Sequence, residues 1–231
     1  MNPSADPSIQ FASRVDELPS NAVARAFDDG TAKLFALANA YDIPFSTCFP
    51  EGSGFFLDQL ERHWRESTEH AWLRLSGAVI KSATAFMSRF VADDQTWADF
   101  GDVQPALTVL VVHRERNVLW CASVGAHQAK VFRGKSAVFE TPREDWAYAH
   151  GQTAGPGLPL TVFRNIEARS ENPFPNVVNW RLQQDDELVM LSFPAASLAD
   201  DDEFRECPVS ELLEGSGAPF VCRLRWRAPI A

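Results

Sequence analysis

The segment LTVLVVHRERNVLWCASVGAHQAKVFRGKSAVF, residues 107–139, carries the clearest structural signal of the chain. Four runs rich in β-branched, aromatic and other apolar residues, at 107–113, 118–124, 129–132 and 137–139, are separated by short polar or glycine-containing segments. This spacing is typical of strands joined by tight turns. We therefore expect an antiparallel meander here.

A further pair of strands is predicted nearer the N-terminus. Apolar runs at 21–27 and 33–38 flank the sequence DDGT at 28–31. An Asp-Gly step favours the tight turn of a hairpin, so the two runs are expected to pair.

Between these strand regions the sequence has the periodicity of helices. Phe56, Leu60 and Trp64 recur every fourth residue, and apolar residues continue at three- and four-residue steps as far as residue 90. Two amphipathic helices fit this pattern, with Ser67 and Thr68 as the cap that starts the second one. One long bent helix is the alternative.

The C-terminal part returns to strands after a glycine- and proline-rich segment at 143–175. Strands are expected at 187–191 and 220–226, with a short acidic helix at 195–205 between them. Together these elements indicate an α+β fold in which helices cover sheets.

Composition places the chain among globular proteins of one domain. Of its 231 residues 45% are hydrophobic, which is enough for a large core, and we expect a single domain at 20–231 after a polar tail at 1–19. A net charge of −10 without a Lys/Arg cluster argues against nucleic-acid binding. No signal peptide or long apolar segment is present, so the expectation is a cytoplasmic protein without membrane contact.

The four cysteines argue against zinc binding and disulfide bonding. They are far apart, with neither a Cys-x-x-Cys pair nor a histidine at zinc-ligand spacing. The cysteines stand at Cys48, Cys121, Cys207 and Cys222.

Three segments, in this order, resemble landmarks of the PP2C-type, metal-dependent protein phosphatase family. LFALANA at 34–40 is similar to the strand whose final Asp-Gly pair holds both catalytic metals in active members, but the pair here is Asn39-Ala40. The segment at 119–129 is similar to a strand, a Gly-Asp-Ser-Arg turn and a second strand, with Ala126 where the aspartate is usual. QDDELVMLSFP at 184–194 resembles the run that ends in Ser-Asp-Gly, with Phe193 in place of that aspartate.

Two weaker matches extend the resemblance over roughly residues 14–227. Pro219 stands where active members have an Asp-Asn step that ligates metal, and Asn21 stands in the early Asn-Glu-Asp-Ala motif. The resemblance implies a PP2C-like four-layer α-β-β-α sandwich, in which two antiparallel β-sheets are flanked by helices.

The departures from the family pattern remove the groups that a two-metal centre requires. Mg²⁺ and Mn²⁺ bind hard oxygen ligands, chiefly carboxylates. Asn39 has one neutral side-chain oxygen, whereas Ala40, Ala126, Phe193 and Pro219 have none. We therefore expect no metal, no other cofactor and no catalytic residue.

This reasoning leaves two functions open within the resemblance, and a third outside it: an unrelated α+β binding protein whose resemblance arises by chance. One is a catalytically inactive PP2C-like pseudophosphatase that acts as a protein-binding or regulatory module. The alternative is a divergent Mn- or Mg-dependent serine/threonine phosphatase with relocated ligands. The carboxylates considered for such relocation are Asp28, Asp29, Asp42, Asp200, Asp201 and Asp202.

The implied partner is a protein, with a phosphoprotein as one class. Family members keep an arginine near the start of the domain that contacts the substrate phosphate, and Arg14 or Arg25 stands near that position. Arg14 is the candidate phosphate contact, because a guanidinium can bind phosphate in a bidentate manner. An ordinary surface role is the alternative for both arginines.

Other motifs carry less weight. Gly134, Lys135 and Ser136 resemble the end of a phosphate-binding loop, but residue 129 is not the glycine that loop requires, so a hairpin turn is predicted. His113 and His127 have no convincing nucleophile pairing and are interpreted as strand or turn residues.

Overall fold

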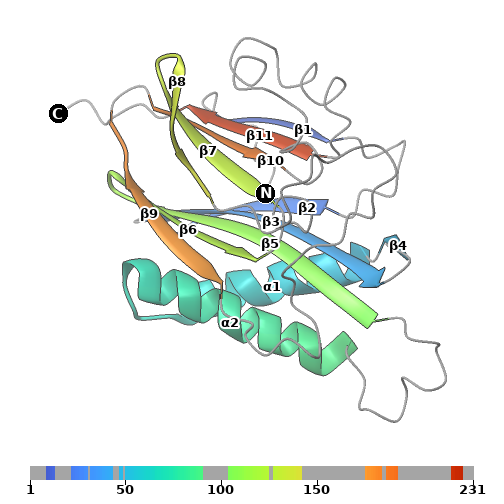
Figure 1. The fold of residues 1–231 in the computed structure, drawn as a ribbon. Helices are drawn as coiled ribbons and strands as arrows, with labels where there is room; N and C mark the ends of the chain where they lie inside the picture. Colours follow the sequence, from blue (N-terminus) through green and yellow to red (C-terminus); the bar gives the residue numbers. More distant parts are fainter. Residues whose placement is uncertain are drawn as a thin grey trace.

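The computed structural model describes residues 9–13, 22–30, 32–43, 47–48, 50–90, 104–124, 127–141, 175–183, 186–191 and 220–225. Within these residues two antiparallel sheets lie face to face, and two helices cover the outer face of one of them (Figure 1). The predicted α+β sandwich is therefore confirmed. The predicted helix at 195–205 lies outside the described residues.

The helix-covered sheet is built around a long central strand. Its strand order is β2-β3-β5-β6-β9, and the short β4 pairs with the end of β3. The strands are β2 Ala22–Asp28, β3 Ala32–Ile43, β4 Thr47–Cys48, β5 Gln104–Glu115, β6 Val118–Val124 and β9 Asn176–Arg181. The hairpin of β2 and β3 is the one that the Asp-Gly step predicts, with Gly30 in the left-handed region at φ 86°.

The second sheet has the order β1-β11-β10-β7-β8. Its strands are β1 Ile9–Ser13, β7 Gln128–Arg133, β8 Ser136–Glu140, β10 Glu187–Leu191 and β11 Phe220–Arg225. The predicted turn at Gly134 joins β7 to β8, and its φ of 57° suits a glycine.

Two helices form the outer layer, α1 at Pro50–Glu66 and α2 at Ala71–Phe90. The prediction of two helices is confirmed, but the predicted cap is not at the helix start. Ser67 Oγ accepts a hydrogen bond from Glu69 N at 3.3 Å, within the connection, and α2 begins at Ala71. Neither described helix combines the length and the hydropathy needed to cross a bilayer.

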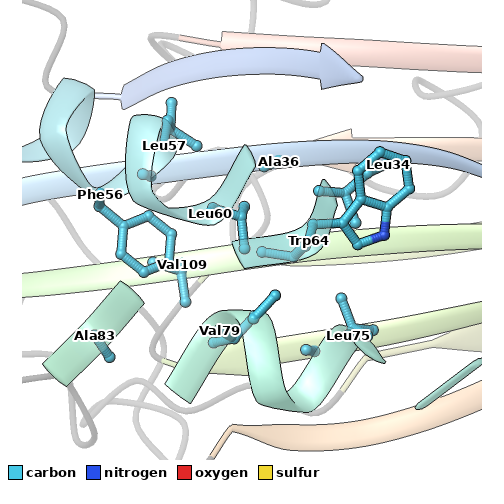
Figure 2. Packing of buried hydrophobic residues seen from close by; sticks show 14 of the residues in the cluster. Leu34, Ala36, Phe56, Leu57, Leu60, Trp64, Leu75, Val79, Ala83 and Val109 are labelled. Atoms are coloured by element: carbon cyan, nitrogen blue, oxygen red, sulfur yellow. The ribbon is translucent and has the colours of Figure 1, made fainter. Parts of the chain in front are cut away.

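One apolar cluster fills the space between the helices and β2, β3, β5 and β6. Phe56, Leu60 and Trp64 of α1 are fully buried there, as their four-residue spacing predicts. They pack on Leu34 and Ala36 of β3 (Figure 2). The even-numbered side chains of β3 therefore face the helices.

A second cluster lies between the two sheets. Phe35 and Leu37 of β3 pack there with Cys121 of β6, and Val131 and Met190 contribute from the other sheet. Cys121 is fully buried, and burial raises the pKa of its thiol to about 12. The odd-numbered side chains of β3 therefore face the opposite sheet.

Three features differ from the sequence-based prediction. The strands predicted as one meander are divided between the sheets: β5 and β6 belong to one, β7 and β8 to the other. The segment predicted as a polar tail contains β1, which pairs with β11. Strand β9 was not predicted, although it forms the edge of the helix-covered sheet beside β6.

Candidate functional site

Several strand ends of the helix-covered sheet lie at the same end of the sandwich. Asn39, in the second half of β3, pairs with Ala22 at the start of β2 and with Thr108 in the first half of β5. The neighbouring residue of β5, Val109, pairs with Val124, where β6 ends. We call this end of the sandwich the site end.

The second sheet contributes its strand ends to the same place. After β6 the chain crosses to β7, whose first residue Gln128 pairs with Leu191 at the end of β10. Leu191 also pairs with Val221 near the start of β11, and Phe220 pairs with Ser13 at the end of β1. Segments that are far apart in the sequence therefore meet at the site end.

Of the predicted site residues, the described part of the chain contains Asn39 and Ala40. The remaining predicted positions follow or precede strand ends that meet at the site end, but the residues themselves lie outside the described part. They are Arg14, Asn21, Ala126, Phe193 and Pro219.

Asn39 and Ala40 face opposite sides of their sheet. Asn39 shares the inter-sheet face with Phe35 and Leu37, whereas Ala40 is fully buried in the cluster under the helices. The Ala40 N–H donates to Ser53 Oγ of α1 at 2.8 Å. The pair thus joins β3 to α1 and presents one neutral amide toward the other sheet.

Several further polar groups are buried at the site end, among them Ser123 and His127. Ser123 of β6 shares the inter-sheet face with Cys121 and is 1% exposed, and its Oγ has no hydrogen-bond partner within the described part of the chain. His127 precedes β7 and is fully buried. Burial lowers the pKa of His127 to about 4, so the ring is neutral at pH 7.

Ser123 was missed by the sequence reasoning, although the alternation of β6 places it beside Cys121. His127 was interpreted as a strand or turn residue, which agrees with its position before β7. Its burial was not visible in the sequence, because the segment LWCASVGAHQA does not reveal which sheet each strand joins.

Two of the six carboxylates considered as substitute metal ligands, Asp28 and Asp29, are engaged elsewhere. Asp28 Oδ1 accepts the Gly30 N–H at 2.8 Å, and Asp29 pairs with Arg74 of α2 at 2.7 Å. Both belong to the β2–β3 turn, at the opposite end of β3 from Asn39. The side chain of Asp42 and residues 200–202 lie outside the described part of the chain.

A buried ion pair also lies at the end opposite the site end. Asp186 is fully buried and accepts two hydrogen bonds from Arg133, at 2.8 and 2.9 Å. Its Oδ2 also accepts the Gln183 N–H at 2.8 Å. This carboxylate joins the start of β10 to the end of β7, which is a structural role.

The described side chains at the site end do not fit a divalent metal. No group of three or more His, Cys, Asp or Glu residues within the described ranges is arranged to hold an ion. An amide, a hydroxyl and a neutral imidazole bring no negative charge to offset a hard dication.

Comparison with known proteins supports the fold assignment. Neither a protein-family model nor a curated protein matches the sequence. The S. agalactiae serine/threonine phosphatase structure has a TM-score of 0.69 at 13% identity, over 95% of this chain and 99% of that one. Serine/threonine phosphatase Stp1 from Staphylococcus aureus has a TM-score of 0.71 at 14% identity, over 94% and 93%.

A third solved structure is the catalytic domain of serine/threonine protein phosphatase PstP in complex with two manganese ions. It has a TM-score of 0.62 at 16% identity, over 94% of this chain and 96% of that one. This chain has the PP2C-type phosphatase fold. The predicted fold class is confirmed, and the Asn39-Ala40 pair is part of a PP2C-type sandwich.

Arg25, which the sequence left open as a phosphate contact, lies away from the site end in this PP2C-type sandwich. It stands in the middle of β2 and forms an ion pair with Asp58 of α1. Arg14 lies outside the described residues and stays a prediction.

Proposed function

We propose that the chain is a PP2C-fold pseudophosphatase, a catalytically inactive module that binds a protein partner and regulates it. The observation that carries this proposal is the Asn39-Ala40 pair. Ala40 packs as an apolar residue under α1, with its N–H bonded to Ser53, and Asn39 presents a neutral amide. A two-metal hydrolytic centre needs negatively charged oxygen ligands, which neither residue supplies.

The neutral surroundings of Asn39 also support the proposal. Ser123 and His127 are buried at the same end of the sandwich, and His127 is uncharged at pH 7. An ion placed among these groups would lose its water shell without gaining a counter-charge.

The first experiment measures metal binding and turnover on the full chain. Isothermal titration with Mn²⁺ and with Mg²⁺ is expected to show no tight site. Hydrolysis of an aryl phosphate and of a phosphothreonine peptide is expected to be the same in millimolar Mn²⁺ and in chelator. Turnover that chelator removes would refute the pseudophosphatase and establish the divergent phosphatase with relocated ligands.

Binding of a phosphorylated segment can be measured separately from cleavage. Fluorescence anisotropy with a labelled phosphothreonine peptide, in chelator, compares the chain with its Arg14→Ala and Arg25→Ala variants. Because Arg25 is paired with Asp58, Arg25→Ala is the matched control. If the partner is a phosphoprotein, Arg14→Ala alone weakens binding. Equal binding by all three proteins would exclude Arg14 as the phosphate contact.

A further inference from the structure

Arg74 joins three elements at the corner where α1 turns into α2. Its Nε donates to the carbonyl oxygen of Trp64 at 2.8 Å, and its Nη2 lies 2.7 Å from Asp29 Oδ2 in the β2–β3 turn. The guanidinium carbon also lies 4.3 Å from the centre of the Trp64 ring. One largely buried cation therefore contacts the end of α1 and the turn while belonging to α2.

Trp64 connects this cation to the sheet. Its indole Nε1–H donates to His113 Nδ1 of β5 at 3.2 Å, and the two rings meet edge to face with their centroids 6.0 Å apart. His113 is 1% exposed. Because Nδ1 accepts a hydrogen bond, the neutral ring carries its proton on Nε2.

The charges around His113 oppose one another. Arg74 disfavours the protonated ring, whereas Glu115 and Asp29 favour it. Glu115 Oε2 is 3.9 Å from Nε2, which is beyond hydrogen-bond distance. Burial is the largest influence, and with Arg74 it lowers the pKa of His113 to about 4.

We propose that Trp64, Arg74, His113 and Asp29 form a latch that holds the α1–α2 corner on the sheet, and that acid opens this latch before the sandwich unfolds. An imidazolium has N–H donors on both ring nitrogens, so it cannot accept the Trp64 indole N–H. Protonation therefore replaces that hydrogen bond with two opposed donors, next to a second cation.

The backbone and the surface at this corner favour opening once the hydrogen bond is lost. Ala71 begins α2 with φ 49°, a conformation that L residues other than glycine rarely adopt. The next two residues, Trp72 and Leu73, are already 48% and 47% exposed. These two residues therefore add little packing to the corner between the buried Trp64 and Leu75.

Native-state hydrogen exchange on the full chain tests the latch. With a pKa of about 4 in the latched state and 6.5 in the open one, the opening equilibrium constant of the α1–α2 corner rises about 100-fold between pH 7 and pH 4. Amides of β3 and β5 are the internal reference and change less, after correction for the intrinsic exchange rate. Equal changes in the corner and the reference strands would overturn the proposal.

Two variants separate the effect of His113 protonation from other effects of low pH on the corner. His113→Gln keeps an acceptor for the indole N–H without a titrating group, so the acid response of the corner is expected to disappear. His127→Gln removes the second histidine that is buried within the described residues, at the site end, and is expected to leave that response intact. An unchanged response in His113→Gln, or its loss in His127→Gln, would overturn the proposal.

If His113→Gln does not fold, an NMR titration of the unmodified chain tests whether protonation of His113 breaks the hydrogen bond from the Trp64 indole. The indole N–H signal of Trp64 is expected to shift with the same midpoint as the His113 ring, well below pH 6.5. A His113 ring that titrates without any change at the Trp64 indole would show that the two groups are not coupled.

Discussion

Replacing His127 with glutamine tests whether its buried ring is uncharged at neutral pH. The ring is fully buried, and its pKa falls from 6.5 to about 4 because burial penalises the charged form. Between these two values the unfolded chain holds a proton that the folded chain does not. The contribution of the neutral His127 ring to the free energy of unfolding is therefore fully present above pH 6.5. It is lost progressively as the pH drops toward 4.

The magnitude follows from the size of the shift. One pKa unit corresponds to about 1.4 kcal/mol, so a depression of this size makes the folded state about 3 kcal/mol less stable at pH 4 than at pH 7. His113, whose pKa is also about 4, contributes a similar loss. Because domain stabilities are about 5–15 kcal/mol, the two histidines together make the fold acid-sensitive.

Urea unfolding at a series of pH values between 7.5 and 4 measures this effect. The destabilisation caused by His127→Gln is expected to be about 3 kcal/mol smaller at pH 4 than at pH 7, because the variant loses the titrating group. His70→Gln, at an exposed position between the helices, is the matched control. A destabilisation by His127→Gln that is the same at both pH values would refute a buried neutral ring.

Three further predictions concern packing, backbone conformation and thiol chemistry. Phe56→Ala leaves a cavity under α1 and is expected to lower the free energy of unfolding in urea by about 3–5 kcal/mol; a loss below 1 kcal/mol would contradict its full burial. Gly77→Ala, inside α2 where an added Cβ meets open space, is expected to stabilise the fold by roughly 0.5–1 kcal/mol. Gly134→Ala, at φ 57°, is expected to destabilise it by about 1 kcal/mol. Thermal melts in which Gly77→Ala lowers the melting temperature and Gly134→Ala raises it would refute this. Cys121 stays unlabelled by a thiol reagent in the native chain and reacts in urea, as peptide mass mapping would show, whereas native labelling would contradict its burial.

The sequence predicted most of the individual elements because their signals are local. The Asp-Gly step placed the β2–β3 hairpin, and the four-residue spacing of Phe56, Leu60 and Trp64 placed the buried face of α1. In both cases the residues that determine the element are close in the sequence, within a few turns of one helix or within one hairpin. Local sequence pattern is then enough to predict the element.

Long-range pairing accounts for what the sequence did not predict. Strands β6 and β7 are separated by only Gly125–His127, yet they belong to different sheets, and alternation within each strand cannot distinguish this from a hairpin. Ile9–Ser13 became a strand because β11, far away in the sequence, is its neighbour. Ser67 does not start α2 because the chain continues through three more residues to Ala71.

For the candidate site, the fold locates two of the predicted positions, Asn39 and Ala40. The register brings the strand ends around Asn39 together, which no single segment could show. The burial of Ser123 and His127 depends on the opposite sheet, so it could not be derived from their own neighbours. The five predicted positions outside the described residues stay predictions.

The positions of the two apolar clusters are compatible with the proposed loss of metal ligands. Both apolar clusters lie along the strands, and among the described side chains of β3 the last member of the inter-sheet cluster, Leu37, comes two residues before Asn39. Replacing carboxylates at the strand ends therefore leaves both clusters intact. It also removes groups that would repel one another in the absence of an ion. Under the proposed function, a loss of catalytic groups at the strand ends and the retention of the two apolar clusters would be physically independent.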